Sequence, residues 1–230
     1  MNAMWIFLIL FALTGLVHVT AILSGKRTLR RISKAFIIPF LLAVYIAGAG
    51  TWPLFPIFAL VFGWMGDLLL IRIDKKICFK LGLASFLLGH LFYIICFMWF
   101  LGFFGFGGAV KVNVMVMAFS IPLAIAGGII LLRLIKPTKE MFIPVIVYMI
   151  VIVTLTLWGL QVFIFNPGFA GALVFFGCLS FMLSDSILAY YTFRMQNRKS
   201  SALLMSFYML AQAGIILGVI ALSPGIFTLI

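Results

Sequence analysis

Long runs of apolar residues alternate along this chain with short polar or glycine-rich connections. Each run is about as long as the ~20 residues that a helix needs to cross the hydrocarbon core of a bilayer. Backbone groups in lipid must be paired internally, so runs of this kind fold as helices. The pattern predicts an all-α fold, a polytopic membrane helical bundle that forms a single domain over residues 1–230. We expect eight transmembrane helices, over residues 3–23, 35–50, 52–72, 81–101, 113–133, 141–162, 168–193 and 201–222.

The basic residues predict the orientation of these helices. Fifteen of the 16 Lys and Arg residues fall in four short stretches, and only Lys111 lies elsewhere. Short connections with an excess of Lys and Arg stay in the cytoplasm. The remaining connections are nearly uncharged and are expected outside, which places both termini outside the cytoplasm. The basic stretches are 26–34, 72–80, 133–139 and 194–199, and the neutral connections are 50–53, 102–112 and 163–167.

Composition excludes a soluble domain. Only 9% of the 230 residues are charged and 66% are hydrophobic, whereas a soluble domain carries roughly 25% charged residues. The formal net charge of +12 would suit nucleic acid, but its confinement to the connections indicates topology and contact with anionic headgroups. We therefore expect membrane lipids and no nucleic acid as partners, and a multi-pass protein of the bacterial cytoplasmic membrane.

Cysteine and histidine give little support for a disulfide or a metal site. Cys78, Cys96 and Cys178 are scattered and odd in number, without a Cys-x-x-Cys pair, so no disulfide framework or thiolate site is indicated. We expect Cys96 and Cys178 to be packed in the interior. With only His18 and His90, a three-histidine zinc site is excluded, while a mixed His/Asp site stays open. No metal and no cofactor are predicted.

The chain has four acidic residues, and two of them lie inside predicted helices. Asp74 and Glu140 stand beside lysines, so both are expected to be solvated. Asp67 and Asp185 lie within the third and seventh predicted helices. Carboxylates inside a membrane are costly, face the bundle interior and indicate function by default. The alternative for each is a structural ion pair or a hydrogen bond between helices.

Other rare polar residues lie at a similar predicted depth. Counted from the nearest basic residue, Asp67 lies roughly 7 Å, Asp185 about 13 Å and His90 about 15 Å inside the cytoplasmic boundary. We expect one buried polar cluster in the cytoplasmic half of the membrane. For its members other than the acids, a plain interhelical hydrogen bond is the alternative. Besides the two acids, the cluster comprises His90, Tyr93, Ser184, Tyr208 and Gln212.

Equal spacings suggest an internal repeat. Asp67 and His90 are 23 residues apart, and so are Asp185 and Tyr208. Each pair brackets a basic stretch between two predicted helices. Two four-helix halves in parallel orientation would produce this arrangement.

Three sequence blocks carry a family resemblance. They are FGWMGDLLL (62–70), FLLGHLFYIICF (86–97) and GALVFFGCLSFMLSDSILA (171–189). In their order and spacing they resemble the signature blocks of the YhhN family, the lysoplasmalogenases. FYMLAQAGIILG (207–218) is similar to the last helix of that family, and the resemblance spans roughly residues 30–220.

The resemblance implies an activity and a catalytic pair. Characterised members of the family hydrolyse the vinyl ether bond of lysoplasmalogens to a fatty aldehyde and glycerophosphoethanolamine or glycerophosphocholine. The resemblance implies eight helices and implies that Asp67 and Asp185 are the catalytic aspartates. Lys34, in RISKAFIIP, is similar to a family lysine that opens the second helix, although Ala35 stands where the family often has proline.

Vinyl ether chemistry suits two unlike carboxyl groups. The bond resists base and breaks after a proton reaches its β-carbon, so the enzyme needs one protonated acid and one carboxylate. Glycosidases meet a related demand with carboxyls in different environments. Desolvation favours a neutral carboxyl group, so we expect the deeper Asp185 to be the acid and Asp67, near Arg72, to be the base. Lys34 and the arginines near it would hold the lipid phosphate, while His90 and Tyr93 would orient the acids or the water.

Two other classes of function remain open from the sequence. Paired intramembrane acids with a histidine also occur in proton-coupled transporters. Against that class, no proline–glycine break lies near Asp67 or Asp185. The second alternative is a non-catalytic lipid-binding membrane protein, in which the acids only hold helices together.

Overall fold

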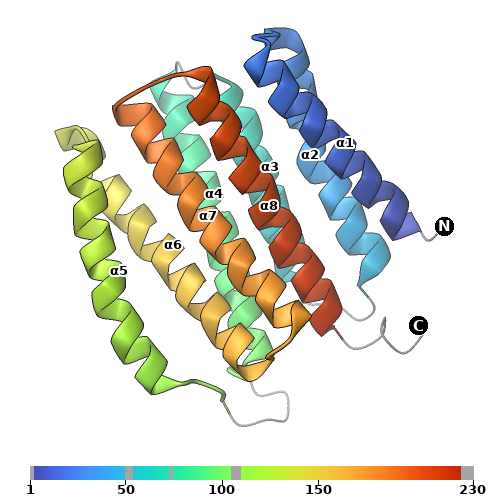
Figure 1. The fold of residues 1–230 in the computed structure, drawn as a ribbon, viewed down its shortest axis with the longest axis vertical. Coiled ribbons are helices and arrows are strands. Elements are labelled where there is room, and N and C mark those ends of the chain that lie inside the picture. The colour runs from blue at the N-terminus through green and yellow to red at the C-terminus, as the bar shows by residue number, and fades with distance from the viewer. Residues whose placement is uncertain (1–2, 50–53, 73–74, 105–109, 224–230) are drawn as a thin grey trace.

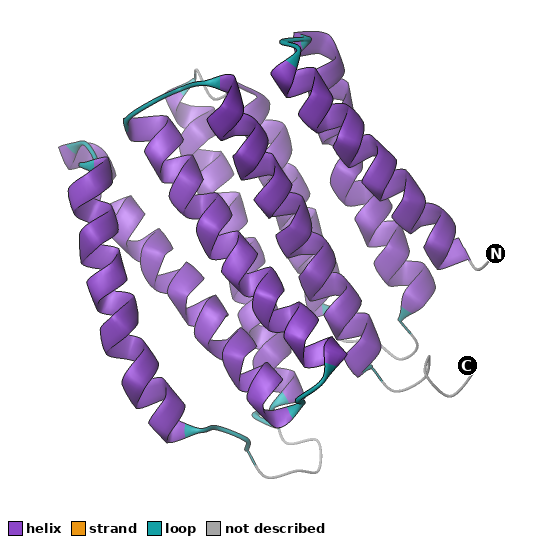
Figure 2. Ribbon diagram, in the orientation of Figure 1, coloured by secondary structure: helices purple, strands orange, loops and turns teal. Residues whose placement is uncertain are grey.

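The computed structural model describes residues 3–49, 54–72, 75–104 and 110–223. These residues form eight helices that are long and apolar enough to cross a membrane, and no strand occurs among them (Figure 2). The predicted all-α fold with eight spanning helices is thereby confirmed. The helices are α1 (Ala3–Leu23), α2 (Arg27–Gly48), α3 (Phe55–Leu69), continued by the 3₁₀ turn η1 (Leu70–Arg72), α4 (Lys76–Phe100), α5 (Val114–Ile135), α6 (Lys139–Phe165), α7 (Phe169–Phe193) and α8 (Arg198–Leu222).

The helices run alternately in opposite directions (Figure 1). The C-terminal ends of α1, α3, α5 and α7 gather at one end of the bundle, which is also where the four basic stretches lie. The start of α1 and the end of α8 lie at the opposite end. The alternation of basic and neutral ends therefore agrees with the sequence pattern, while the side of the membrane on which each end lies stays a prediction.

The helices are arranged in two layers. Helix α8 packs between α1 and α7, and behind this layer α3 packs between α2 and α4. Helix α6 contacts both α4 and α7, and α5 lies at the outer edge beyond it. In Figure 1, α7 and α8 lie in front of α4 and α3, respectively. The space between the two layers holds the apolar core and, toward the basic end, the polar residues of the site.

Several helices begin earlier than the sequence predicted. Helices α2, α4, α6 and α8 begin at Arg27, Lys76, Lys139 and Arg198, rather than at residues 35, 81, 141 and 201. Arg and Lys are good helix formers, and their long side chains can reach water from the first turns of a membrane helix. The basic residues therefore belong to the helix starts more than to loops. This correction matters most for Lys34, which lies well inside α2.

Close helix contacts surround the buried acids. At Gly177 of α7, an added Cβ atom would lie 2.8 Å from Ile215 N and 3.0 Å from Ala211 O of α8. At Gly63 of α3, it would lie 3.2 Å from Gln212 Nε2. Small residues of this kind allow membrane helices to approach closely. Glycine at these positions therefore brings α8 within reach of both acid-bearing helices.

Replacement of Gly177 by alanine is expected to destabilise the α7–α8 pair. The new methyl group would meet backbone atoms, which cannot move aside as a side-chain end can, and overpacking of this kind costs about 1–3 kcal/mol. The measurement is the thermal unfolding midpoint of the protein in mild detergent. Gly127→Ala on α5 is the matched control, because no atom lies within 4 Å of its added Cβ. Equal midpoints for the two variants would contradict the expected clash.

Other residues singled out in the sequence have simple environments. Cys96 and Cys178 are buried and free, as predicted. Glu140 is exposed in the first turn of α6, which confirms the expected solvation. Asp74 lies outside the described residues.

Candidate functional site

Asp67 lies in the last turn of α3 and contacts two other helices. Its side chain is only 2% exposed, and the Lys34 Nζ atom of α2 lies 3.2 Å from Oδ1. The Tyr208 hydroxyl of α8 donates a hydrogen bond to Oδ2 at 2.8 Å. A buried carboxylate requires such partners, since an unpaired charge in a low dielectric is strongly unfavourable. Asp67 therefore joins α2, α3 and α8 at one point.

Lys34 reaches Asp67 because α2 begins earlier than expected. It lies seven residues after Arg27, or about 10 Å along the helix. Its side chain is 11% exposed, and its ammonium group is directed to the carboxylate. The prediction that Lys34 opens the second helix is therefore wrong, because the basic residues before it are helical. The ammonium group of Lys34 is therefore engaged by the Asp67 carboxylate.

A chain of hydrogen bonds continues from Asp67 across the bundle. Gln212 Nε2 donates to the Tyr208 hydroxyl oxygen at 3.4 Å, and the Tyr93 hydroxyl donates to Gln212 Oε1 at 2.6 Å. Each hydroxyl or amide in this chain is oriented by its neighbour. Tyr208 is thus held as a donor toward Asp67, and the chain links α4 to α3 through α8.

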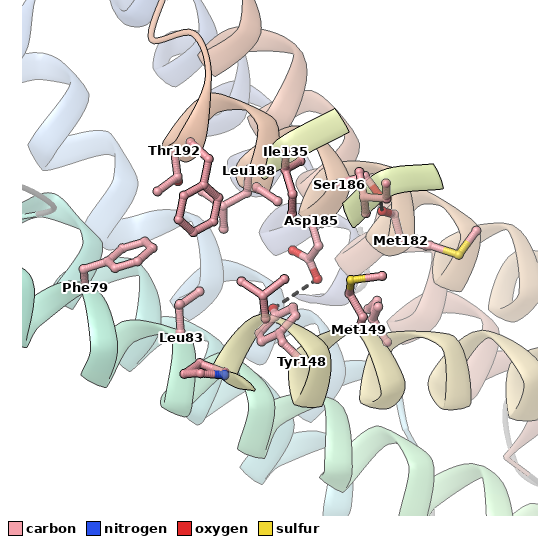
Figure 3. Close-up of a pocket in the computed structure, with 16 residues that line it drawn as sticks. Phe79, Leu83, Ile135, Tyr148, Met149, Met182, Asp185, Ser186, Leu188 and Thr192 are labelled. Carbon is pink, nitrogen blue, oxygen red and sulfur yellow. Dashed lines mark hydrogen bonds between the residues drawn. The ribbon is translucent and has the colours of Figure 1, made fainter. Parts of the chain in front are cut away.

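Asp185 has a different set of partners (Figure 3). The Tyr148 hydroxyl of α6 donates to its Oδ2 atom at 3.0 Å, and His90 Nε2 of α4 lies 3.8 Å from the same oxygen. The side chain is 12% exposed. Within the described residues, Asp185 has no ion pair with Lys or Arg, and no hydrogen bond reaches its Oδ1 atom. One carboxyl oxygen is therefore anchored, while the other has no hydrogen-bond partner among the described residues.

Phe181 separates the two acid groups. Its ring centroid lies 4.9 Å from that of His90 and 5.8 Å from that of Tyr208, edge to face in both cases. The predicted single cluster is thus two hydrogen-bonded groups, one around Asp67 and one around Asp185, with an aromatic ring between them. The sequence could not show this, because Phe181 is one of 26 phenylalanines.

The two residue pairs with equal spacing are connected crosswise. Asp67 contacts Tyr208, and Asp185 contacts His90. Each acid is therefore supported by the helix pair that carries the other acid. The structure does not test whether the two halves are repeats, so the repeat stays a prediction.

Both acids line one cleft at the basic end of the bundle. Its empty volume is about 600 Å³, and its wall includes Arg30 and Lys34 of α2 beside Asp67 and Asp185. Ser184 also lies in this wall, but its hydroxyl donates to the Leu204 carbonyl oxygen at 3.2 Å and contacts neither acid. Ser184 therefore joins α7 to α8 and shapes the cleft.

The chemistry available in this cleft is that of two unlike carboxyl groups. The Lys34 ammonium group lies against Asp67. Asp185 instead accepts a hydrogen bond from the Tyr148 hydroxyl and lies near the imidazole ring of His90. Such a pair can combine proton donation with stabilisation of positive charge. In the part of the chain that the structure describes, no group of three or more His, Cys, Asp or Glu side chains could hold a metal ion.

Tyr148 was missing from the sequence prediction, and Arg30 was included there only as one of the arginines near Lys34. Tyr148 contacts Asp185, and Arg30 lies in the cleft wall, where it donates to the Ser201 hydroxyl oxygen at 3.2 Å. A signal for Tyr148 existed, because it lies nine residues after Lys139, as Tyr208 lies nine residues after Lys199. The sequence did not distinguish Arg30 from the other arginines near Lys34, since its position inside α2 was not foreseen.

Comparison with known proteins agrees with this description. No curated protein and no solved structure gives a significant match. The family model described as the YhhN family matches residues 29–219. This range contains both acids, the partners described above, the five complete helices α3 to α7, and most of α2 and α8. The chain therefore belongs to the YhhN family.

Proposed function

We propose that this protein is an intramembrane lysoplasmalogenase-type hydrolase, an enzyme that cleaves the sn-1 vinyl ether bond of lysoplasmalogens. The observation that carries the proposal is that two carboxyl groups with unlike partners, the buried Asp67 and the half-buried Asp185, line one cleft. Membership of the YhhN family is consistent with a hydrolase of this kind. The products are a fatty aldehyde and glycerophosphoethanolamine or glycerophosphocholine.

The reaction assigns one step to each acid. Asp185 gives its proton to the β-carbon of the vinyl ether, which produces an oxocarbenium ion at the carbon beside oxygen. The Asp67 carboxylate stabilises this positive charge and takes a proton from the water that adds to it. The resulting hemiacetal collapses to an aldehyde and an alcohol, so that one water is consumed for each ether bond broken. The two acids are given different roles because their partners differ: among the described residues, Asp67 has a Lys or Arg side chain beside it and Asp185 does not.

The residues that contact the two acids support this assignment of roles. Tyr148 holds one oxygen of Asp185 and leaves Oδ1 to carry the proton. Tyr208 and Lys34 hold Asp67. Arg30 is the better candidate for the lipid phosphate, because Lys34 is already paired with Asp67 and Arg30 lies nearer the start of α2. Phe181 packs edge to face against both His90 and Tyr208 and so supports the residues that contact the two acids.

Aldehyde release from lysoplasmenylethanolamine tests the proposal. The purified protein in mild detergent is expected to produce a fatty aldehyde, measured with a coupled dehydrogenase. The matched substrate is the saturated alkyl-ether lysolipid, which has no double bond to protonate and should stay intact. If the folded protein released no aldehyde, the proposal would be wrong, and assays of lipid binding and proton-coupled transport would follow.

The origin of the transferred proton gives an independent check of the mechanism. In D₂O, protonation of the β-carbon should place one deuterium on the aldehyde carbon next to the carbonyl group. Immediate reduction of the aldehyde and mass spectrometry of the alcohol would measure it. Aldehyde that carries no deuterium at this position would exclude protonation of the β-carbon by an exchangeable acid.

Removal of the Tyr148 hydroxyl is expected to lower the rate about tenfold, which is the usual effect of one hydrogen bond to a charged or ionisable partner. Tyr148→Phe keeps the ring that packs edge to face against His90, with centroids 5.6 Å apart. The measurement is kcat/KM for aldehyde release. Tyr190→Phe is the control, because Tyr190 is 40% exposed on α7 and lines neither the cleft nor the cavity of Figure 3. Equal rates for the two variants would show that Tyr148 does not support Asp185.

A further inference from the structure

A second cavity begins on the other side of Asp185 from the cleft. It has an empty volume of about 550 Å³, and Asp185 and Tyr148 lie in its wall (Figure 3). A larger cavity of about 1040 Å³ between α5, α6 and α7 continues it. The two share wall residues that include Leu131, Met149 and Met182. Together they form one groove, which we call the α5–α6–α7 groove, and Asp185 stands between it and the cleft.

The groove is chemically suited to hydrocarbon. Among the described residues that line it, Asp185 is the only charged one. The Thr156 hydroxyl donates to the Ile152 carbonyl oxygen at 2.9 Å, and the Ser186 hydroxyl donates to the Met182 carbonyl oxygen at 2.7 Å. These hydroxyls are therefore engaged by their own helices and offer no donor to a ligand. The Thr192 hydroxyl has no hydrogen-bond partner among the described residues, but it lies in the part of the groove that also contains Asp185. In the part between α5, α6 and α7, a polar ligand would be desolvated with little compensation.

The groove also has the dimensions of one lipid chain. Helix α7 lines it from Phe175 to Phe193, and the part between Asp185 and Phe175 is ten residues or about 15 Å long. This is half of the ~30 Å hydrocarbon core, and therefore the depth that one chain occupies in one leaflet. Its outer wall is α5, in which only Ile135 is buried and which lies at the edge of the bundle in Figure 1.

We infer that the α5–α6–α7 groove holds the single alkenyl chain of the lysolipid substrate, with the vinyl ether at Asp185 and the phosphate in the cleft. The inference rests on the proposed function. It follows from adjacency, because Asp185 and Leu188 lie in the walls of both cavities, and a molecule with one end in each would lie beside the Asp185 side chain. A lysolipid has a charged head and one long apolar chain. The cleft, which contains Arg30, suits the head, and the apolar groove suits the chain.

Selectivity for chain length tests the inference. Gly127 lines the groove, and no atom lies within 4 Å of its added Cβ, so Gly127→Phe can add a ring to the wall of the groove without a clash at Cβ. We expect kcat/KM for substrates with hexadecenyl and octadecenyl chains to fall about tenfold, a moderate effect for overpacking, while the dodecenyl substrate is affected less. Ile125→Phe adds a similar ring on α5 outside the groove, at a residue 59% exposed, and should leave the profile unchanged.

Photolabelling provides a readout that does not require catalysis. The probe is a saturated alkyl-ether lysophosphatidylethanolamine with a diazirine at the end of its chain. Labels are expected on groove residues such as Leu160 and Leu179, and Gly127→Phe should remove them. If labels fell elsewhere, or if a two-chain phospholipid displaced the probe as well as a lysolipid does, the inference would be wrong. Labelling of the groove without aldehyde release would uphold the groove assignment and reject the hydrolase.

Discussion

Asp185→Asn is expected to lower kcat/KM for aldehyde release by about 10²–10⁴-fold, the usual contribution of a general acid. Asparagine has the shape of aspartic acid and can still accept the hydrogen bond from Tyr148. It has no acidic proton to give to the β-carbon. Because Asp185 has no ion pair with Lys or Arg among the described residues, the substitution leaves no unpaired cation, and the unfolding midpoint should change little. Activity and stability are therefore expected to separate in this variant.

The control for this prediction is another neutralised acid. Glu140→Gln removes a carboxylate that is exposed in the first turn of α6, and it should keep the activity of the parent protein. Aldehyde release by Asp185→Asn at the parent rate would exclude Asp185 as the proton donor. A loss of activity that accompanied a large loss of stability would assign Asp185 a structural role instead.

The membrane fold was predictable because its two main signals are strong. Apolar runs of sufficient length specify spanning helices, and the clustering of Lys and Arg specifies their alternation. The helix starts were predicted too late because the basic residues were assigned to connections. In the structure, α2, α4, α6 and α8 each begin at a basic residue of one of these stretches. Hydropathy alone cannot show that a charged residue is helical, since the charge lowers the hydropathy of the very turn that contains it.

The sequence predicted most residues of the candidate site, but not which of them contact one another. The rarity of polar residues inside helices identified Asp67, Asp185 and Tyr208, and the structure places each in contact with a residue of another helix. The ion pair of Lys34 with Asp67 depends on the start of α2, and the separation by Phe181 depends on side-chain packing between layers. Neither is encoded in a local pattern. Contacts between helices far apart in sequence are therefore the part that required the structure.

The Lys34–Asp67 pair should show the largest effect on stability. Lys34→Met removes the ammonium group and leaves the carboxylate, which is 2% exposed, without its cation. Removal of one partner of a buried pair costs about 3–5 kcal/mol, so we expect a much lower unfolding midpoint in detergent. Arg31→Met is the matched control, because Arg31 is exposed on the same helix and its loss should change the midpoint little.

The double variant Lys34→Met/Asp67→Asn separates the structural role of the pair from the catalytic role of Asp67. Replacing both charges of a buried pair by neutral groups of similar size is often close to neutral for stability, so the double variant should regain most of the midpoint that Lys34→Met loses. It should not regain aldehyde release, because no carboxylate remains to stabilise the oxocarbenium ion and activate the water. Recovery of both stability and activity would mean that Asp67 only anchors α2 and α8 to α3 and that catalysis depends on Asp185 alone. Recovery of stability without activity would identify Asp67 as a catalytic residue whose ion pair with Lys34 makes its burial tolerable.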